Sequence, residues 1–578
     1  MAFLDEAVKG GRRPFVIVEI DMDYCQEVEG TSPCTSLAGG DEKCTNTFVT
    51  CNDTPNYNKG AKTYKFSDIA LPGQGIYPFI TRVDTAPTEI TPGKGLGVRA
   101  NCKVIFTDAI DSDIGIDPAV NDRSIIATER GTFWGKFFAR NPYYYGREVR
   151  VKYGMLDDAG GITNVETFTY IIDKFEYQSR TQTVSLMGKD HLTLGDNVKG
   201  KTPKATTGKT TGALNAGATV FSVGTGEGAE YAASGRIAID KEIMSYTRAT
   251  DTFTVTRGQQ GTTAKSHSSG ATVQEVRYWD AESVSTVLQD LLETDAGIPP
   301  SKIPIVDWQA EDTQWLSSYS ISRNIIKPVE INKLVGELMQ QCSFSIWADD
   351  RDSGKIKFAV EAPLLGSELA LANTYTDADI IENTLTVVDD SKSRASAVWV
   401  HHTVIDPAEG SGKVSNYEAT EGRGDAALAG ENAYNQEQYK EIYSDWLRLS
   451  TPASLTATRY LARFKNPPKK VNFKLDASAK KLQVGDHFFL RSAALQDKNG
   501  NENTLEFQCV SLDYDPVNTT FNIKALQFRF SADRQCVVAP NTQVGYFIAR
   551  DSERTAYGFI CDEATGKMSN GDDPYLVV

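Results

Sequence analysis

The chain is poor in the residues and motifs on which most enzymes and membrane proteins depend. It has only five histidines among 578 residues, so little imidazole is present for acid–base chemistry or metal binding. Neither the G-x-S-x-G motif of serine hydrolases nor the H-E-x-x-H motif of zinc proteases occurs. No segment approaches the roughly 20 consecutive apolar residues that a spanning helix needs. We therefore expect no catalytic site and no membrane span.

Basic residues are also fewer than acidic residues. The 76 acidic and 60 basic residues give a formal net charge of -16. Such a surface repels phosphate and anionic lipid, which disfavours a protein that reads DNA or RNA. An acidic wall would instead suit a tube through which DNA slides. No signal-peptide pattern occurs, because Arg12, Arg13 and Pro14 precede an apolar run of only strand length, so we expect folding in a cytoplasm.

The commonest pattern is the alternation of apolar and polar residues. It runs through 16–22, 149–153 and 471–476 and predicts half-buried strands. Phe344–Trp347 and Lys355–Val360 flank a polar turn and predict a β-hairpin. The expected fold class is mainly β with a few helices.

Helices are expected where apolar residues recur at intervals of three and four. This spacing occurs over 284–292, 331–342 and 439–447. Pro328 stands just before the second of these stripes, where proline is tolerated at a helix start.

The length predicts about four domains, at roughly 150 residues for each. A stretch without apolar residues larger than alanine, 199–211, predicts a linker, and the polar stretch 407–430 predicts a long loop. We expect several β-barrel-like or sandwich-like domains in series plus a small inserted β-module. The predicted division is residues 1–200 with a cysteine-rich segment at 20–60, the module at 212–276, a second domain at 277–400, a β-rich domain at 401–540 with helices in 435–465, and a C-terminal docking segment at 541–578.

Four of the nine cysteines are concentrated in one segment with little to bury. Cys25, Cys34, Cys44 and Cys51 are separated by eight, nine and six residues. Four thiolates can enclose a zinc ion or an iron–sulfur cluster, and metal binding would supply folding energy to such a segment. No CxxC pair occurs, and the nearest histidine is His191. Two disulfides, or four unrelated thiols, are the alternatives to a metal site.

Three other motifs have simpler interpretations. The run Gly208–Thr210 resembles the end of a phosphate-binding loop, but Pro203 stands where that loop requires glycine. The acidic run 349–352 has no closing glutamate for a calcium loop, and a hairpin turn explains it. His401 and His402 are adjacent on a predicted strand, where they would point to opposite faces.

Blocks of the sequence resemble one family. FVIVEIDMDYC (15–25), KCTNTFVTCNDTPNYN (43–58) and GTFWGKFFARNPYYYGREVRVKYG (131–154) resemble tail-tip proteins of lambda-like siphophages and of gene transfer agents. Residues 237–273 resemble a small β-module, with the signature RGQxGT…H…GA, that recurs in phage tail and baseplate proteins. Residues 325–358 resemble a baseplate hub pattern, in which a helix after KPVE precedes a β-hairpin.

The resemblance implies a homotrimeric hub whose subunits each carry two β-barrel-like domains, which gives a pseudo-sixfold ring. That ring would lie between the distal tail protein and a central fibre or tip protein, around the tape-measure protein, and DNA would pass through its lumen without specific binding. It also implies that Cys25, Cys34, Cys44 and Cys51 hold a four-iron–four-sulfur cluster, with zinc as the alternative. Because some relatives place their cluster cysteines elsewhere, Cys509, Cys536 and Cys561, with Cys342 or Cys102, form an alternative set.

We therefore expect a structural, non-enzymatic protein of the virion tail tip, assembled in the cytoplasm of a bacterial host. A receptor-binding adhesin, with the small module as its binding domain, is the first alternative. A tail-associated hydrolase with paired carboxylates is the second, although nothing in the sequence identifies the pair.

Overall fold

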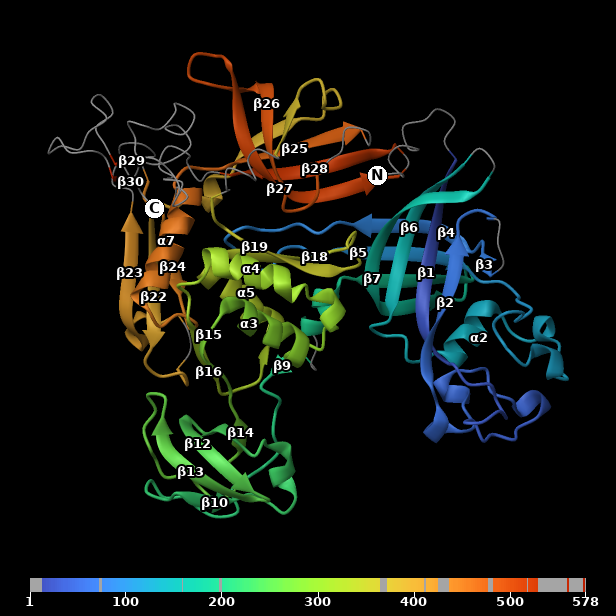
Figure 1. The fold of residues 1–578 in the computed structure, drawn as a ribbon, viewed down its shortest axis with the longest axis horizontal. Coiled ribbons are helices and arrows are strands. Elements are labelled where there is room, and N and C mark those ends of the chain that lie inside the picture. The colour runs from blue at the N-terminus through green and yellow to red at the C-terminus, as the bar shows by residue number, and fades with distance from the viewer. Residues whose placement is uncertain are drawn as a thin grey trace.

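The computed structural model describes residues 13–71, 75–157, 160–196, 200–363, 372–409, 412–424, 436–476, 482–516 and 518–528, together with strands β29 (Phe559–Ile560) and β30 (Tyr575–Leu576). The predicted docking segment 541–578 lies outside the described residues apart from those two strands. The fold is mainly β with several sheets and a few helices, as predicted (Figure 1). None of the helices in these ranges is long and apolar enough to cross a membrane.

The N-terminal part is an eight-stranded sheet. Its order is β3-β2-β1-β6-β7-β8-β5-β4, with β1 at Pro14–Cys25, β2 at Lys59–Ser67, β3 at Ile76–Tyr77, β4 at Ile80–Ala86, β5 at Asn101–Thr107, β6 at Glu148–Leu156, β7 at Ile162–Gln178 and β8 at Thr183–Lys189. The predicted strands at 16–22 and 149–153 fall in β1 and β6, which pair antiparallel with Val18 opposite Val151. Both side chains are fully buried, so the apolar face of the alternation lies in the core.

A short helix, α2 (Phe133–Arg140), closes one end of this sheet. It begins at Thr132, whose hydroxyl accepts a hydrogen bond from the backbone N–H of Gly135. The indole of Trp134 stacks on the ring of Phe66 with centroids 5.1 Å apart, and both side chains are fully buried.

The inserted module has a hydrophobic core of its own and forms a separate lobe in Figure 1. Its sheet has the order β10-β13-β12-β11-β14, with β10 at Val220–Ser222, β11 at Ser234–Ile239, β12 at Glu242–Ala249, β13 at Thr252–Gln259 and β14 at Val273–Glu275. Residues 236–244 form a tight hairpin between β11 and β12. Its turn includes Asp240 at a φ of 55°.

The middle of the chain carries most of the helices. They are α3 (Val284–Gln289), which continues into a π-helical turn at Asp290–Asp295, α4 (Ile305–Trp315) and α5 (Ile331–Cys342). The short ladders here are β15 (Arg277–Glu282) with β16 (Ile321–Ile325), β17 (Val329–Glu330) with β9 (Lys201–Thr202), and the hairpin of β18 (Phe344–Asp349) with β19 (Lys355–Val360). The helices predicted at 284–292 and 331–342 and the hairpin are confirmed. The predicted linker 199–211 is wrong in part, because β9 pairs with β17.

The helix predicted at 439–447 is wrong. Tyr439–Tyr443 is a strand, β24, which pairs parallel to β22 (Ala397–Val404). Of its residues only Ile442 is buried, whereas Tyr439 is 60% exposed, so the apparent helical stripe does not face one core. A helix in this region, α7, runs over Ser450–Phe464 instead.

The long loop predicted at 407–430 is also wrong in part. It contains strand β23 (Tyr417–Gly424), which pairs antiparallel with β22. The residues of this stretch at 410–411 and 425–430 lie outside the described part of the chain.

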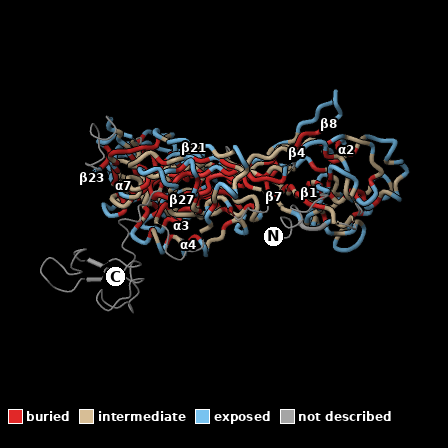
Figure 2. Tube along the Cα trace, turned by 90° about the horizontal axis from the view of Figure 1, so that it is seen from above, coloured by how far each residue is buried: buried red, intermediate tan, exposed pale blue. Residues whose placement is uncertain are grey.

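The last sheet has six strands and shares a core with the first. Its order is β20-β26-β27-β28-β25-β21, with β20 at Asn373–Thr376, β21 at Thr386–Asp389, β25 at Lys469–Asp476, β26 at His487–Gln496, β27 at Glu502–Asp515 and β28 at Thr520–Gln527. One continuous apolar cluster includes residues of both sheets, and Tyr153 and Tyr514 meet in it with ring centroids 5.8 Å apart. Figure 2 shows buried residues running along the length of the body.

Candidate functional site

The four clustered cysteines lie in the long connection between β1 and β2. Cys25 is the last residue of β1 and pairs with Lys59, the first of β2. The chain between them forms three single-turn 3-10 helices, Gly40–Glu42, Phe48–Thr50 and Thr54–Asn56, and is otherwise irregular. All four thiols are free; that of Cys25 is buried and the other three are partly exposed. Side chains between and beyond the cysteines, rather than a core, hold this segment in place.

Asn46 links two of the cysteines. Its backbone carbonyl accepts a 2.7 Å hydrogen bond from the N–H of Cys25, and its side-chain Nδ2 donates to the carbonyl of Cys25 over 3.0 Å. The thiol of Cys44 donates to its Oδ1 over 3.6 Å. Asn46 has a φ of 58°, a left-handed conformation that asparagine tolerates better than most residues.

Asp53 joins the regions of the other two cysteines. Its Oδ2 accepts hydrogen bonds from the backbone N–H of Thr35, next to Cys34, over 2.6 Å and from the Thr35 hydroxyl over 2.9 Å. The backbone N–H of Asp53 donates to the sulfur of Cys51 over 3.4 Å. These bonds tie the chain beside Cys34 to the chain around Cys51.

Glu29 connects three further parts of the segment. Its carboxylate accepts hydrogen bonds from the Ser36 hydroxyl (2.6 Å), the Asn52 side chain (2.9 Å) and the backbone N–H of Cys44 (2.6 Å). Burial by itself would raise the pKa of Glu29, but these hydrogen bonds outweigh it and hold that pKa below its usual value. The carboxylate is therefore charged while it binds the segment.

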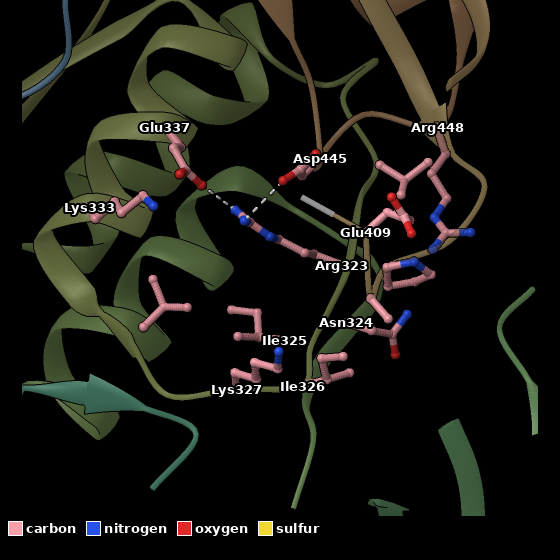
Figure 3. Close-up of a pocket in the computed structure, with 14 residues that line it drawn as sticks. Arg323, Asn324, Ile325, Ile326, Lys327, Lys333, Glu337, Glu409, Asp445 and Arg448 are labelled. Atoms are coloured by element: carbon pink, nitrogen blue, oxygen red, sulfur yellow. Dashed lines mark hydrogen bonds and ion pairs between the residues drawn. The ribbon is translucent and has the colours of Figure 1, made fainter. Parts of the chain in front are cut away.

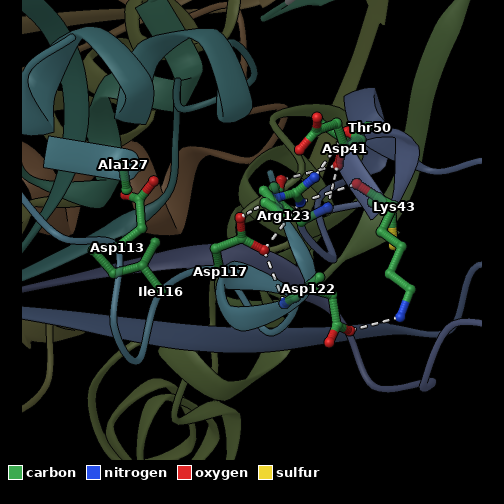
Figure 4. A network of polar contacts seen from close by, with 12 residues as sticks. Asp41, Lys43, Thr50, Asp113, Ile116, Asp117, Asp122, Arg123 and Ala127 are labelled. Carbon is green, nitrogen blue, oxygen red and sulfur yellow. Dashed lines mark hydrogen bonds and ion pairs between the residues drawn. The ribbon is translucent and has the colours of Figure 1, made fainter. Parts of the chain in front are cut away.

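Arg123 attaches the segment to the rest of the first domain (Figure 4). Its guanidinium pairs with Asp117 (Nε to Oδ2, 2.5 Å) and donates to the backbone carbonyls of Asp41 over 2.9 Å and of Lys43 over 3.0 Å. The ammonium of Lys43 lies 2.7 Å from Oδ2 of Asp122, which is next to Arg123 in sequence. A charged guanidinium with several acceptors gives this otherwise core-poor contact its strength.

The thiols lie near enough to one another to interact electrostatically. Burial raises the pKa of Cys44 to about 11, and Glu29 and Cys51 contribute. The pKa of Cys51 is also raised, first by burial and then by Cys25 and Cys34. Both raised pKa values favour the protonated thiol in the metal-free segment, whereas the number and type of the donors, four cysteines, fit a thiolate-bound metal. Among the residues that the structure describes, however, no three His, Cys, Asp or Glu side chains are gathered as a ready metal site.

The alternative cysteine set is dispersed. Cys102 in β5 and Cys509 in β27 are buried in the core shared by the two large sheets, and Cys342 ends α5 in a different core. Cys536 and Cys561 lie outside the described residues.

The other sequence motifs take structural roles. The run Gly208–Thr210 lies at the edge of the small module, where the backbone N–H of Lys209 donates to Glu227. Asp349 caps the turn of the β18–β19 hairpin by accepting from the backbone N–H of Arg351 over 3.1 Å. His401 and His402 are both buried on β22, and their Nδ1 atoms lie within hydrogen-bonding distance of different threonine hydroxyls.

The four cysteines were predicted from the sequence, but the residues that hold the chain around them by hydrogen bonds and ion pairs were not. Glu29, Asn46 and Asp53 stand between or beside the cysteines, so their proximity was a signal that could have identified them. Arg123 and Asp117 carry no such signal, because only the folded chain brings them to the segment.

The chain is similar in structure to prophage tail proteins. The 43 kDa tail protein of prophage MuSo2 from Shewanella oneidensis is 8% identical at a TM-score of 0.35, with 78% of this chain and 99% of that chain covered. A tail protein from Neisseria meningitidis is 9% identical at 0.35, covering 78% and 95%. The prophage tail protein gp18 from Listeria monocytogenes is 10% identical at 0.30, covering 67% and 86%. No protein-family model and no curated protein sequence matches the chain.

Proposed function

We propose that the chain is a structural subunit of a bacteriophage tail tip, which assembles as a homotrimeric hub. The observation that carries the proposal is the presence of two large, mainly antiparallel sheets, of eight and six strands, built around one shared core. Three chains with two such units each make a ring of six units, which matches a hexameric tail tube. The three sequence blocks at 15–154, 237–273 and 325–358 also occur in the order that the family resemblance implies.

The ring closes through heterologous contacts, in which different surfaces of neighbouring subunits meet, and it closes only if the rotation between subunits is right. In the virion it lies between the distal tail protein and a central fibre or tip protein, around the tape-measure protein. The net charge of -16 suits the passage of DNA without specific binding, because an acidic lumen does not hold phosphate. We propose no catalytic role for the chain.

Measuring the oligomeric state of the chain tests the proposal that it forms a trimeric hub. Light scattering after size-exclusion chromatography is expected to give three copies per particle, alone or with the neighbouring tail proteins, and electron micrographs are expected to show rings with a central opening. A chain that stays monomeric with those neighbours present contradicts the proposal.

The cysteine-rich segment is proposed as a structural metal centre. Cys25, Cys34, Cys44 and Cys51 would hold an iron–sulfur cluster, or zinc as the alternative, and the group would supply folding energy where the segment has little core. Glu29, Asn46, Asp53 and Arg123 position the chain around the thiols in the metal-free segment.

Anaerobic purification followed by absorption spectroscopy and metal analysis tests this centre. A broad band near ~400 nm with several irons per chain, lost in Cys44→Ser and kept in Cys342→Ala from the alternative set, is the expected result. Colourless protein with one zinc per chain would mean that the four cysteines form the site but that they bind zinc. Protein with neither metal, or a band that depends on Cys342 instead, contradicts the assignment.

A receptor-binding role is the second candidate, because the small module has its own core and could be removed as a unit. Phage particles that lack residues 212–276 distinguish the two roles. If the module is the adhesin, the particles assemble but do not adsorb to host cells. If it serves only the hub, adsorption is kept.

A further inference from the structure

A cavity of about 360 Å³ lies beside the attachment of the small module and has no part in the site described above. Its walls come from β16, from the chain that leads into α5, from α5 itself, and from the segments after β22 and β24 (Figure 3). The volume falls within the roughly 300–1,000 Å³ typical of ligand pockets, which is far more than a single small ion fills.

Arg323 occupies the centre of the cavity and is already neutralised. Its guanidinium lies 2.7 Å from a carboxylate oxygen of Glu337 and 3.2 Å from one of Asp445. It also stacks over the ring of Trp446 at 4.5 Å. Tyr417 donates a further hydrogen bond to Asp445 over 2.7 Å. These contacts fix the position of Arg323 and neutralise it, and one of the two negative charges is left over.

Three other cations around the cavity have no such partner. Within the described part of the chain, the side chains of Lys327, Lys333 and Arg448 make no ion pair or hydrogen bond. The remaining acid of the wall, Glu409, is paired with Lys241 over 3.2 Å and with Lys413 over 3.4 Å. Figure 3 shows Lys327 and Lys333 on one side of Arg323 and Arg448 on the other. Four cations and three carboxylates line the cavity, and one of these carboxylates, Glu409, is already paired outside the lining. The cavity therefore has an excess of positive charge on a chain whose formal net charge is -16.

The wall also has an apolar side. Ile325, Ile326, Val329, Pro407 and Ala408 line it between the cations. Ile326 and Ala408 in addition contact apolar residues at the base of the small module, so a ligand in the cavity would touch the point where the module joins the body.

We propose that this cavity binds an acidic segment of a partner protein, with carboxylates on Lys327, Lys333 and Arg448 and an apolar side chain against Ile326 and Ala408. The cation set and the apolar wall together fit a peptide with both kinds of side chain. The apolar part of the wall favours a peptide over DNA or inorganic phosphate, because neither of these has an apolar side chain to place there. The inference goes beyond the hub and does not depend on it, because binding is measured on the single chain.

Fluorescence anisotropy of a labelled peptide with alternating glutamate and leucine, titrated with the full chain, tests the proposal. The same peptide with glutamine in place of glutamate is the matched probe. The acidic peptide is expected to bind at least about tenfold more tightly, as expected for charge-assisted contacts, and to weaken as salt is added. The triple variant Lys327→Ala/Lys333→Ala/Arg448→Ala is expected to lose at least this tenfold preference.

Two controls separate the site from general charge and from misfolding. The variant Lys392→Ala/Lys498→Ala removes surface cations elsewhere and is expected to bind as the unmodified chain does. Ala408→Trp fills the cavity without changing its charge and is expected to block the peptide. The proposal is overturned if the acidic and glutamine peptides bind equally well. It is also overturned if both the triple variant and Ala408→Trp bind the acidic peptide as the unmodified chain does. Displacement of the peptide by inorganic phosphate or by a short DNA duplex, at a concentration equal to that of the peptide, contradicts it as well.

Discussion

The hydroxyl of Tyr170 donates a hydrogen bond to a carboxylate oxygen of Asp350 across 3.2 Å. Tyr170 belongs to β7 of the first sheet and Asp350 to the turn of the β18–β19 hairpin, so this bond joins two parts of the chain that are remote in sequence. A second buried carboxyl, that of Asp190, interacts with Asp350 and is only 1% exposed. Burial raises the pKa of Asp190 to about 7 and that of Asp350 to about 6, although Arg99 and Arg351 oppose the two shifts.

Because of these raised pKa values, the stability of the contact between β7 and the β18–β19 hairpin depends on pH. A carboxyl whose folded pKa is raised is neutral when buried, so its contribution to stability is complete below the unfolded pKa of about 3.9 and is lost as pH rises through 7. We predict that Asp190→Asn changes the unfolding free energy little near pH 4 but raises it by a few kcal/mol at pH 8. Urea unfolding of both proteins across this pH range measures the difference. Asp307→Asn, at an exposed position, is expected to show no such trend, and a difference for Asp190→Asn that is independent of pH would contradict the prediction.

Glu242 is the centre of the small module and explains its signature sequence. Its carboxylate accepts two 2.7 Å hydrogen bonds from Arg257 and lies 2.9 Å from Nε2 of His267. The backbone N–H groups of Gly258 and Lys265 each donate to it over 3.0 Å. Burial would raise the pKa of Glu242, but these hydrogen bonds outweigh it and lower the pKa to about 2.

We predict that Glu242→Gln destabilises the module by about 3 kcal/mol at pH 7, because Arg257 is left buried without its charge partner. A lowered folded pKa gives stability above the unfolded pKa of about 4.3 that is lost as pH falls toward 2, so the effect of the variant shrinks in acid. Hydrogen exchange of peptides from 209–275 in the full chain measures the change at pH 7, and urea unfolding followed by a probe in the module gives its pH dependence. Glu275→Gln, in the same sheet, is the matched control. Equal exchange in the two variants would count against the network.

Arg463 of α7 forms a buried ion pair with Glu361, and its second amino group donates to Gln508 of β27 over 2.6 Å. The guanidinium side chain is 1% exposed. We predict that Arg463→Met costs about 3–5 kcal/mol, because the buried carboxylate of Glu361 then keeps its hydrogen bond from Ser345 but loses its charge partner. The double variant Arg463→Met/Glu361→Leu is expected to recover most of this loss. Chemical denaturation of the two single variants and the double variant gives the free energies for a double-mutant cycle. If the loss of stability in the double variant equals the sum of the two single losses, the pair is not coupled.

Asn46 is expected to control the exposure of the metal-free thiols. Asn46→Ala removes its side-chain hydrogen bonds and places alanine, which tolerates the left-handed conformation less well than asparagine, at a φ of 58°, so the segment should open more often. We predict faster labelling of Cys44 by a maleimide in the metal-free protein. Asn46→Gly, which keeps the conformation and loses only the side-chain bonds, is expected to have a smaller effect. Identical rates in all three proteins would exclude a positioning role for Asn46.

Local patterns were enough for the elements whose own residues carry the signal. The helix at Ile331–Cys342 and the hairpin that follows were predicted because their apolar spacing and turn residues are local properties. The helix predicted at 439–447 was wrong because pairing with β22, a distant strand, outweighed the local spacing. The same limit applies to the candidate site, where the clustering of the cysteines was visible in the sequence but the contribution of Arg123 was not.

By itself the sequence determined the β-rich class of the chain, the small module and the concentration of four thiols between two strands, because each depends on residues that are neighbours in the chain. Only the tertiary structure decided that the first and last sheets share a core and that Arg351 lies over the rings of both Phe168 and Phe521. It also decided that Lys327, Lys333 and Arg448 surround one cavity. These relationships join segments far apart in sequence, and they are set by which apolar faces are buried together and by which charges are left without partners once those faces have packed.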